Sequence, residues 1–260
     1  MERGVATAGV GWRLEVHPEL PSTSSHLVAL AREGAPDGLA VLALRQTAGR
    51  GQSGRLWCDA PGNLALSLLV RPSHAAREAP QWSLLGGVAL VEAARAVDPE
   101  PEALSLRWPN DLLRHGAKCA GVLAESALSP GGGLAWMVLG FGVNLSHAPT
   151  VPGRATARLG RAEPPEAFAA RLLDRVSAWR RVRDSEGFGP VRAAWAAHGP
   201  APGRRIAARC GRGGTAEGGF AGLGEDGSLL LETGQGTILR IAVGEVLEAA
   251  ASEHRVAEAR

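Results

Sequence analysis

A chain of 260 residues, 45% of them hydrophobic, is long enough to bury a substantial core and to hold one large and one small domain. Its formal net charge of +2 is close to neutral, so nothing calls for nucleic acid as a partner. The three cysteines are widely spaced and odd in number, which argues against a disulfide framework or a cysteine-held zinc cluster. With no secretion signal and no apolar run of about 18 residues, we expect a soluble, cytoplasmic protein that does not enter a membrane.

Strands and helices are predicted to alternate over the first part of the chain. A strand around residues 12–16 is followed by Ser22, Thr23, Ser24 and Ser25, which precede a helical pattern over 26–32. Hydroxyls at a helix start satisfy free N–H groups, so capping explains part of this cluster. Four hydroxyls exceed what one cap needs, which leaves some for a small polar ligand. Buried strands over 39–44 and 63–71 and a long apolar helix over 82–97 are expected next.

A glycine-rich loop follows the strand over 39–44. Its glycines have the spacing of a dinucleotide-binding fingerprint, but proline and glycine follow where such a site needs a helix. The sequences that mark a Walker A loop or a protein kinase are also missing. Flexible backbone and two guanidinium groups still suit a phosphate-bearing ligand, the alternative being a plain glycine-rich turn. The loop reads Gly49, Arg50, Gly51, Gln52, Ser53, Gly54, Arg55, Leu56 and Trp57.

The chain contains a single lysine. All of its 28 basic residues except Lys118 are arginine. A compositional bias toward arginine explains the arginines but not the exception. Lysine offers a compact ammonium charge with rotatable donors, which a planar guanidinium does not imitate. We therefore expect a functional role for Lys118, with a chance survivor of the bias as the alternative.

Three segments are predicted to meet around this lysine. A short strand over 104–108 is broken by Pro109 into a turn, and the segment 116–125, with Lys118 at its start, is expected to be its hairpin partner. A third strand over 134–138 runs into alternate glycines at 140–144, which suggests backbone packed close to a neighbour. Glycine-rich edges and polar turns from separate segments predict a small-molecule cleft.

The last part of the chain predicts a second domain. A loop over 146–165 leads into an amphipathic helix over 165–183 and a shorter helix over 191–197. The Pro- and Gly-rich residues 199–203 mark a domain boundary, dividing the chain into residues 1–198 and 199–260. Beyond the boundary, short strands separated by turns predict a small β-barrel of SH3-like size, followed by a terminal helix over 248–260. The strands are expected at 205–209, 217–223, 228–232 and 237–241.

Taken together, these motifs resemble the biotin protein ligase family, in the family's order and over nearly the whole chain. The resemblance implies an α+β fold: a catalytic domain with a central mixed β-sheet flanked by helices, as in class II synthetases, plus the small C-terminal SH3-like barrel. The absence of an N-terminal helical domain is similar to the monofunctional members, which have no DNA-binding domain. The matching segments are Ser22 to Ser24, Gln46, Gly49 to Trp57, Trp108 to Asp111, Lys118 to Gly121 and Gly140 to Asn144.

The family's chemistry implies two steps. The biotin carboxylate attacks the α-phosphate of ATP to give biotinyl-5′-AMP and pyrophosphate, and a lysine of a biotin carboxyl carrier domain then takes the biotinyl group. The implied partner is the carrier domain of a biotin-dependent carboxylase, with no nucleic acid and no membrane, and a homodimer is left open. Mg²⁺ is expected with ATP, but no cluster of Asp and Glu identifies its ligands.

The resemblance also implies residue roles. Lys118 and Arg50 are the implied catalytic residues, because positive charge must offset the repulsion between the carboxylate and phosphate oxygens. Lys118 would touch the biotin carboxylate and the α-phosphate, Arg50 would position the phosphates, and Arg55 would support ATP binding. The remaining residues implied for biotin are Ser22, Thr23, Ser24, Gln46, Gly49, Gly51 and Gly121. Those implied for the nucleotide side are Trp57, Asn110, Asp111 and Asn144.

Gln52 departs from the family pattern, which commonly has arginine at this position. The loss of that charge predicts weaker retention of biotinyl-5′-AMP. Two alternative functions stay open: a lipoate or octanoate ligase or transferase of the same fold, and a non-catalytic nucleotide- or vitamin-binding module. The Gly-Arg-Gly loop and the C-terminal β-domain favour the biotin interpretation, and Lys118 together with Arg50 favours an enzyme.

Overall fold

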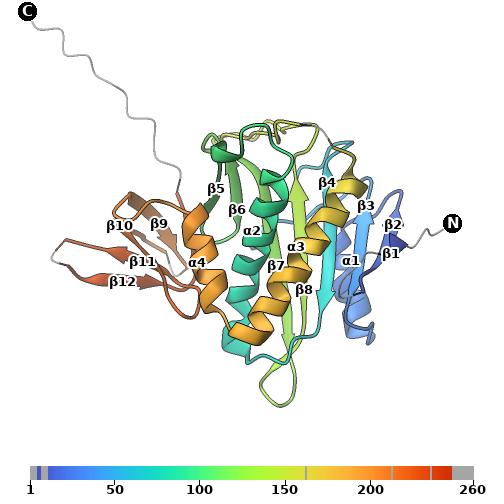
Figure 1. The fold of residues 1–260 in the computed structure, drawn as a ribbon, viewed down its shortest axis with the longest axis horizontal. Helices are drawn as coiled ribbons and strands as arrows, with labels where there is room; N and C mark the ends of the chain where they lie inside the picture. The colour runs from blue at the N-terminus through green and yellow to red at the C-terminus, as the bar shows by residue number, and fades with distance from the viewer. Residues whose placement is uncertain (1–4, 7–10, 162, 212, 235, 248–260) are drawn as a thin grey trace, which may run out of the picture.

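The computed structural model describes residues 5–6, 11–161, 163–211, 213–234 and 236–247 of the chain. Its main element is an eight-stranded mixed sheet with the strand order β1-β2-β3-β4-β8-β7-β6-β5 (Figure 1). Strands β2 and β3 run parallel, and the other neighbouring pairs are antiparallel. The strands are β1 (Val5–Ala6), β2 (Arg13–His17), β3 (Leu39–Ala43), β4 (Leu64–Val70), β5 (Leu104–Arg107), β6 (Asp111–Arg114), β7 (Ala117–Leu128) and β8 (Leu134–Val143).

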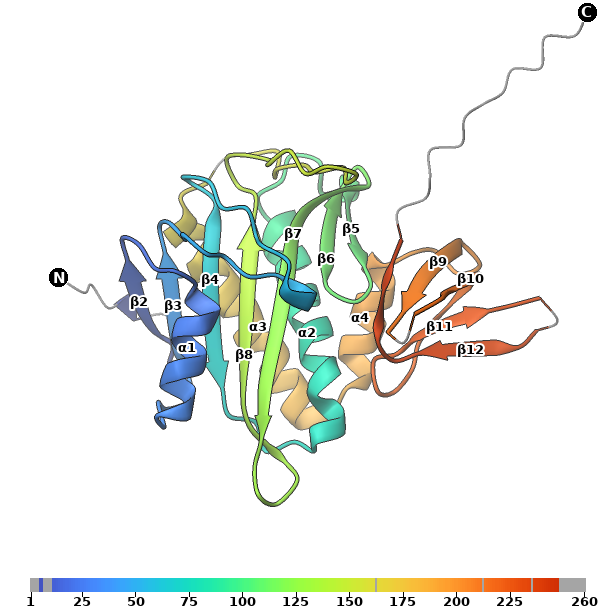
Figure 2. The ribbon, with the colours of Figure 1, turned by 180° about the vertical axis from the view of Figure 1, so that it is seen from behind.

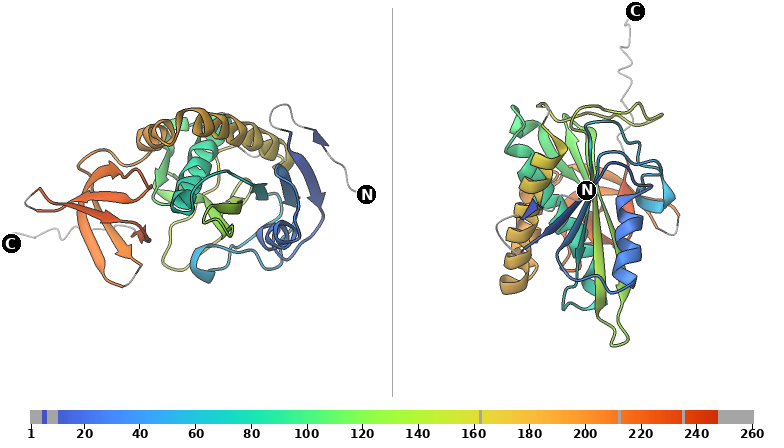
Figure 3. Two further views of the ribbon diagram at one scale, coloured as in Figure 1. Left: turned by 90° about the horizontal axis from the view of Figure 1, so that it is seen from below. Right: turned by 90° about the vertical axis from the view of Figure 1, so that its right-hand side faces the viewer.

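Helices cover both faces of this sheet. Three of them, α2 (Ala79–Arg95), α3 (Pro165–Glu186) and α4 (Gly189–His198), pack on one face, and α1 (Thr23–Arg32) packs on the other (Figures 1 and 3). Every residue of β3 and β4 is buried, because both faces of these central strands are covered. This explains why β3 is apolar throughout and β4 is apolar except for Ser67. Short 3₁₀ helices η1 (Gln52–Gly54), η2 (Ala76–Glu78) and η3 (Pro101–Ala103) lie in the connections.

A separate five-stranded antiparallel sheet follows α4, with the order β12-β11-β10-β9-β13. Its hydrophobic residues join the same core as the main sheet, where Trp195 of α4 lies 6.3 Å from Phe220 between ring centroids. Two hydrogen bonds tie it further: Trp108 Nε1 donates to the Gly227 carbonyl at 3.0 Å, and Gln81 Nε2 donates to the Glu225 carbonyl at 2.8 Å. The strands are β9 (Arg205–Cys210), β10 (Thr215–Leu223), β11 (Leu229–Glu232), β12 (Ile238–Ile241) and β13 (Gly244–Val246).

The predicted α+β fold with a central mixed sheet is confirmed, but several details differ. Over the described residues the C-terminal sheet ends at β12 and β13 without closing, so a closed SH3-like barrel is not observed. The hairpin prediction was wrong: β5 pairs with the unpredicted β6, which lies between β5 and β7. Pro109 turns the chain at the end of β5, and the apolar Leu112 and Leu113 extend it again.

Element boundaries also moved. Helix α1 begins at Thr23 rather than residue 26, because Ser22 is its N-cap and accepts a hydrogen bond from the Ser25 amide at 3.3 Å. Strand β8 continues through the alternate glycines to Val143. The predicted helix over 248–260 lies outside the described residues. No helix in the described part of the chain has the length and apolar character to cross a membrane.

Candidate active site

A cleft of about 820 Å³ lies on the face of the main sheet that carries α1. The glycine-rich loop with η1 crosses β8 and β7 on this face (Figure 2). The cleft collects nearly all of the site residues predicted from the sequence. Gly49 is the exception: it lies behind the lining, where an added Cβ would come within 2.7 Å of the Trp57 carbonyl oxygen. The predicted residues in the lining are Ser22, Thr23, Ser24, Gln46, Arg50, Gly51, Gln52, Arg55, Trp57, Asn110, Asp111, Lys118, Gly121 and Asn144.

One end of the cleft, next to α1 and β4, is neutral and rich in hydroxyls; we call it the hydroxyl end. Thr23 Oγ1 and Ser24 Oγ lie 2.8 and 3.0 Å from Ser67 Oγ, and all three residues are buried. The Thr23 backbone amide donates to Gln46 Oε1 at 2.8 Å. The backbone amide of Gln46 donates to Asp59 Oδ2 at 2.6 Å. These bonds fix the position of each hydroxyl before a ligand arrives.

Ser67 was not predicted as a site residue. It lies in the middle of β4, on the face toward α1, and its hydroxyl joins the two predicted ones. A single hydroxyl inside the apolar run Leu64 to Val70 is the sequence signal that could have identified it. Its partners, however, lie more than 40 residues away in the chain.

The glycines of β8 leave room for the site. A Cβ on Gly140 would collide with Ser24 Oγ, and one on Gly142 would collide with the Trp57 ring. The sequence pattern of alternate glycines therefore marked a close approach, as predicted. In the loop itself, Ser53 and Gly54 take left-handed φ values of 56° and 75°, and the Gly51 amide donates to the Arg55 carbonyl at 2.7 Å.

The opposite end of the cleft, toward β6, β7 and the C-terminal sheet, is charged; we call it the charged end. Asp111 is paired with two cations there: Lys118 Nζ contacts its Oδ1, and Arg107 Nη2 donates to its Oδ2 at 2.8 Å. Gly121 lies opposite Asp111 in the β6–β7 ladder, and an added Cβ would lie only 3.2 Å from Lys118 Nζ. The glycine therefore leaves this partly buried ion pair open to the cleft.

The titration of this pair follows from its surroundings. Burial alone would raise the pKa of Asp111, but the charges of Lys118 and Arg107 outweigh burial and lower it. Burial lowers the pKa of Lys118, while the Asp111 carboxylate opposes this shift. An ionised Asp111 therefore holds the Lys118 ammonium in place, 5.9 Å from the centroid of the Trp57 ring.

The two loop arginines pair with carboxylates from distant elements. Arg50 Nη2 donates to Glu125 Oε1 of β7 at 2.8 Å, and its Nη1 donates to Ser25 Oγ of α1 at 3.1 Å. Arg55 forms a forked pair with Glu245 of β13 at 3.1 and 2.5 Å. Arg154 Nη2 reaches the same carboxylate at 3.3 Å. The Arg55 hydrogen bond lowers the pKa of Glu245, so one carboxylate links the loop to the C-terminal sheet.

Buried polar atoms without partners line the cleft. Among the described residues, Trp57 Nε1 and Asn144 Oδ1 have no hydrogen-bond partner although both atoms are buried. Asn144 Nδ2 donates to the Ala157 carbonyl at 2.8 Å, which leaves the amide oxygen for a ligand. Asn110 Nδ2 donates to the Val122 carbonyl at 2.5 Å and secures the turn. An unpaired buried donor and acceptor at one site indicate a polar ligand.

Neither the Cys119 thiol nor the carboxylates of the cleft suggest other chemistry. Cys119 is fully buried on β7, and burial raises the pKa of its thiol to about 12, so no thiolate forms near neutral pH. The carboxylates that line the cleft, Asp111 and Glu245, are both committed to cations. The described carboxylates of the cleft thus form no dedicated Mg²⁺ site, and a Mg²⁺ ion entering with ATP would be held mainly by the phosphates.

Comparison with known proteins agrees with this fold and cleft. Residues 18–144 match the model of the Biotin/lipoate A/B protein ligase family. The chain is 38% identical over 221 residues to the biotin--[acetyl-CoA-carboxylase] ligase of Paracoccus denitrificans, across 81% of this chain and 90% of that protein. It is 39% identical over 188 residues to the Mycobacterium tuberculosis protein of the same name, across 67% of this chain and 68% of that protein.

Solved structures extend the resemblance over most of the chain. The biotin protein ligase from Aquifex aeolicus in complex with biotin and ATP superposes with a TM-score of 0.75 at 26% identity, covering 90% of this chain and 97% of that one. The fold and the cleft thus define a protein of the biotin and lipoate ligase class. Within this class, the chain belongs to the biotin protein ligase family.

Proposed function

We propose that this protein attaches biotin to a lysine of a biotin carboxyl carrier domain, using ATP and passing through biotinyl-5′-AMP. The observation that carries the proposal is the position of Lys118. The sole lysine of the chain lies in a cleft with neutral hydroxyls at one end and a cluster of cations at the other. A ligand with a polar, uncharged ring system and a carboxylate fits this gradient.

The hydroxyl end suits the ureido group of biotin. That group presents one carbonyl acceptor and two N–H donors, and hydroxyls both donate and accept. Thr23 and Ser24 line the cleft and are both held within hydrogen-bond distance of Ser67, so their hydroxyls are already oriented for such a group. Ser22 and Gln46 support them, the first as the helix cap and the second through the Thr23 amide.

The charged end suits adenylation. In this step a biotin carboxylate oxygen bonds to the α-phosphorus of ATP, the bond from that phosphorus to the bridging oxygen breaks, and pyrophosphate leaves. Carboxylate and phosphate oxygens repel one another, so cations aimed at the reacting atoms lower the barrier. We assign this role to Lys118, assisted by Arg50 and Arg55 of the glycine loop. Trp57, Asn110, Asp111 and Asn144 are assigned to the nucleotide side, with Asp111 orienting Lys118.

In the second step the neutral amine of a carrier lysine attacks the acyl carbon of the adenylate. The acyl–phosphate bond breaks, AMP leaves, and the amine nitrogen gives up a proton as the amide forms. Positive charge near the α-phosphate also stabilises the leaving AMP. Lys118 and Arg50 would therefore serve both steps without changing position.

The finer organisation is also a proposal. Residues 1–198 would form the catalytic domain and residues 199–260 a C-terminal domain of SH3-like topology, in which the described five-stranded sheet is the larger part. The Arg55–Glu245 pair supports a role for that sheet in holding the loop. We place the protein in the cytoplasm with ATP and its carrier partner, with no nucleic acid partner, and leave a homodimer to a sedimentation measurement.

The test is exchange of radiolabelled pyrophosphate into ATP. Exchange that depends on biotin, followed by transfer of biotin to a purified carrier domain, is the expected result. Exchange that depends on lipoate or octanoate instead would favour the rival ligase of the same fold. Ligand binding without any exchange would favour a non-catalytic binding module and would contradict the proposal.

A further inference from the structure

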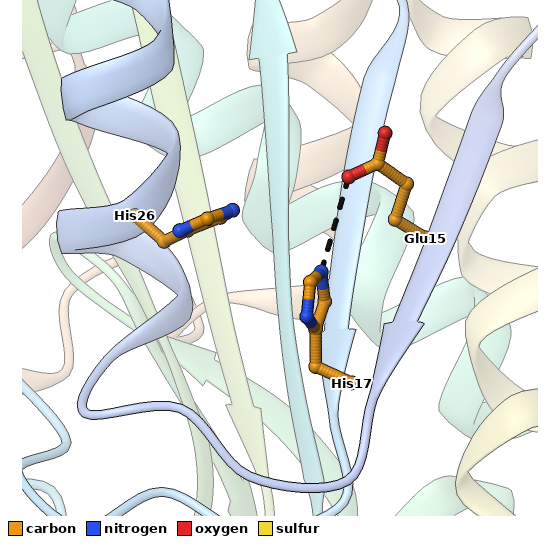
Figure 4. A group of neighbouring side chains, drawn as sticks. All are labelled: Glu15, His17 and His26. Atoms are coloured by element: carbon orange, nitrogen blue, oxygen red, sulfur yellow. Dashed lines mark ion pairs between the residues drawn. The ribbon is translucent and has the colours of Figure 1, made fainter. Parts of the chain in front are cut away.

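A second group of ligating side chains lies outside the cleft, between β2 and α1. Glu15 and His17 are two residues apart on β2, so their side chains share one face of the strand. His26 projects from α1 toward them (Figure 4). One ligand atom from each of the three residues lies within 4.8 Å of the others. Two imidazoles and a carboxylate from two elements thus converge on one point.

His17 is the member with incomplete hydrogen bonding. Its Nε2 atom is buried, and no described residue makes a hydrogen bond with it. The nearest carboxylate oxygen, Glu15 Oε2, is 3.8 Å away, which is too far for a hydrogen bond. A buried nitrogen without a partner is costly, and its lone pair is available to a metal ion.

Glu15 is arranged as a metal-binding carboxylate would be. Its Oε1 atom accepts from Arg13 Nε at 3.0 Å, while Oε2 is the oxygen nearest His17. An outer partner that fixes one oxygen of a ligating carboxylate is the usual arrangement around bound metals. The Arg13 side chain is 72% exposed, so its charge is screened by solvent and opposes a bound cation only weakly.

We propose that Glu15, His17 and His26 bind a divalent transition-metal ion, Zn²⁺ in particular, with one coordination position left to water. Imidazole and carboxylate ligands suit Zn²⁺, and three protein ligands plus water complete a tetrahedron. Bonds of about 2.0–2.1 Å place the ligating atoms about 3.3 Å apart. The three side chains are partly exposed and lie within 4.8 Å, so small rotations of the side chains bring them together.

The site would connect the strand to the helix that borders the cleft. His26 follows Ser25, whose hydroxyl accepts from Arg50 Nη1 at 3.1 Å, and the same helix begins with Thr23 and Ser24. The two imidazole rings already meet edge to face, with centroids 5.3 Å apart. Bound Zn²⁺ would join β2 to α1 and restrain the helix end that carries the hydroxyls of the cleft.

The experiment is a calorimetric titration of the EDTA-treated, dialysed protein with Zn²⁺ alone. We expect one strong site per chain, with binding about tenfold weaker or more in each of Glu15→Gln, His17→Gln and His26→Gln. His115→Gln is the matched control, because His115 is an exposed histidine with a carboxylate neighbour, Glu100, at 3.3 Å. The His115→Gln protein should bind Zn²⁺ with the same affinity as the unaltered protein.

Two further measurements distinguish one defined metal site from weak binding to separate surface histidines. Co²⁺ should give the visible absorption of four- or five-coordinate cobalt in the unaltered protein and lose it in His17→Gln. Hydrogen exchange of residues 23–32 should slow when Zn²⁺ is added. The proposal would be overturned by a lack of strong Zn²⁺ binding in the unaltered protein. It would also be overturned if the His17→Gln and His26→Gln proteins, with unchanged circular dichroism, bound Zn²⁺ as tightly as the unaltered protein.

Discussion

The two ends of the cleft are held by different kinds of interaction. At the hydroxyl end, Thr23, Ser24 and Ser67 are buried and joined by neutral hydrogen bonds between a helix and a central strand. At the charged end, Lys118 and Asp111 form a partly buried ion pair on β7 and β6, while Arg55 reaches across to Glu245 with a side chain that is 44% exposed. Rigid neutral groups suit recognition, and charges suit a reaction in which negative charge develops.

Replacing the sole lysine should have the largest effect. Lys118→Arg keeps the charge but replaces the compact ammonium beside Asp111 and the Trp57 ring with a larger, planar guanidinium. We expect biotin-dependent pyrophosphate exchange to fall about 100-fold or more, as on loss of an electrostatic stabiliser. Circular dichroism should stay unchanged, and near-normal exchange would refute the point-charge argument for this end of the cleft.

The second-largest effect is expected from a substitution at Gly142, beneath the Trp57 ring. Gly142→Ala places a methyl group against the Trp57 ring, so the ring and its loop must move. We expect the KM for ATP to rise about tenfold or more, with a smaller change for biotin. Gly131→Ala is the control, because a Cβ there meets nothing within 4 Å. Equal KM values for ATP in the two variants would show that the position of Trp57 does not matter for nucleotide binding.

The hydroxyl end is tested by Ser67→Ala. Loss of this hydroxyl leaves Thr23 and Ser24 without their shared partner. We expect biotin binding to weaken by about 1 kcal/mol, which corresponds to a KM for biotin about fivefold higher. The KM for ATP should not change, and Ser126→Ala, at an exposed position on β7, should change neither. A shift in the KM for ATP instead of biotin would reverse the assignment of the two ends.

A substitution at Gln52 tests how much positive charge the glycine-rich loop needs to retain the adenylate. Gln52 and Arg55 both line the cleft and are joined by a backbone hydrogen bond of 3.1 Å, so an arginine at position 52 would add a second cation to this part of the loop. We expect Gln52→Arg to slow dissociation of biotinyl-5′-AMP severalfold, because exposed charges contribute modestly. Measuring the release of radiolabelled adenylate checks this, and equal rates in both proteins would sink the hypothesis.

The smallest effect is expected from the pair that links the loop to the C-terminal sheet. Glu245→Gln should destabilise the protein by about 1 kcal/mol at neutral pH, since the carboxylate is only partly buried. The Arg55 hydrogen bond lowers the pKa of Glu245, so its contribution is present above pH of about 4.5 and is lost as pH falls through the lowered pKa. Urea unfolding at pH 7 and pH 3 measures this, with Glu217→Gln as the exposed control. A pH-independent difference would contradict the linkage.

Much of the site was predictable because its residue types are unusual for their positions. Four hydroxyls where one caps a helix, alternate glycines within a strand and a lone lysine among arginines each conflict with a purely structural explanation. The cleft gathers the lysine, Gly140 and Gly142, and three of the four hydroxyls, with exposed Ser25 left outside its lining. Strand β6 was missed because four residues after a proline turn carry too little periodicity to predict a strand. The open C-terminal sheet differs from the predicted barrel because closure depends on pairing between strands, which local patterns do not encode.

The amino-acid sequence by itself determined the mixed α+β fold, the residues of the cleft and the family, because these depend on local patterns and on the order of motifs along the chain. Only the tertiary structure decided the partners: Ser67 for Thr23 and Ser24, Glu125 for Arg50, Glu245 for Arg55 and Asp111 for Lys118. It also brought Glu15, His17 and His26 together. The physical reason is that hydrogen bonds and ion pairs act over a few ångströms, and most of these pairs are set by the packing of α1, the glycine loop and the C-terminal sheet against the main sheet rather than by spacing along the chain.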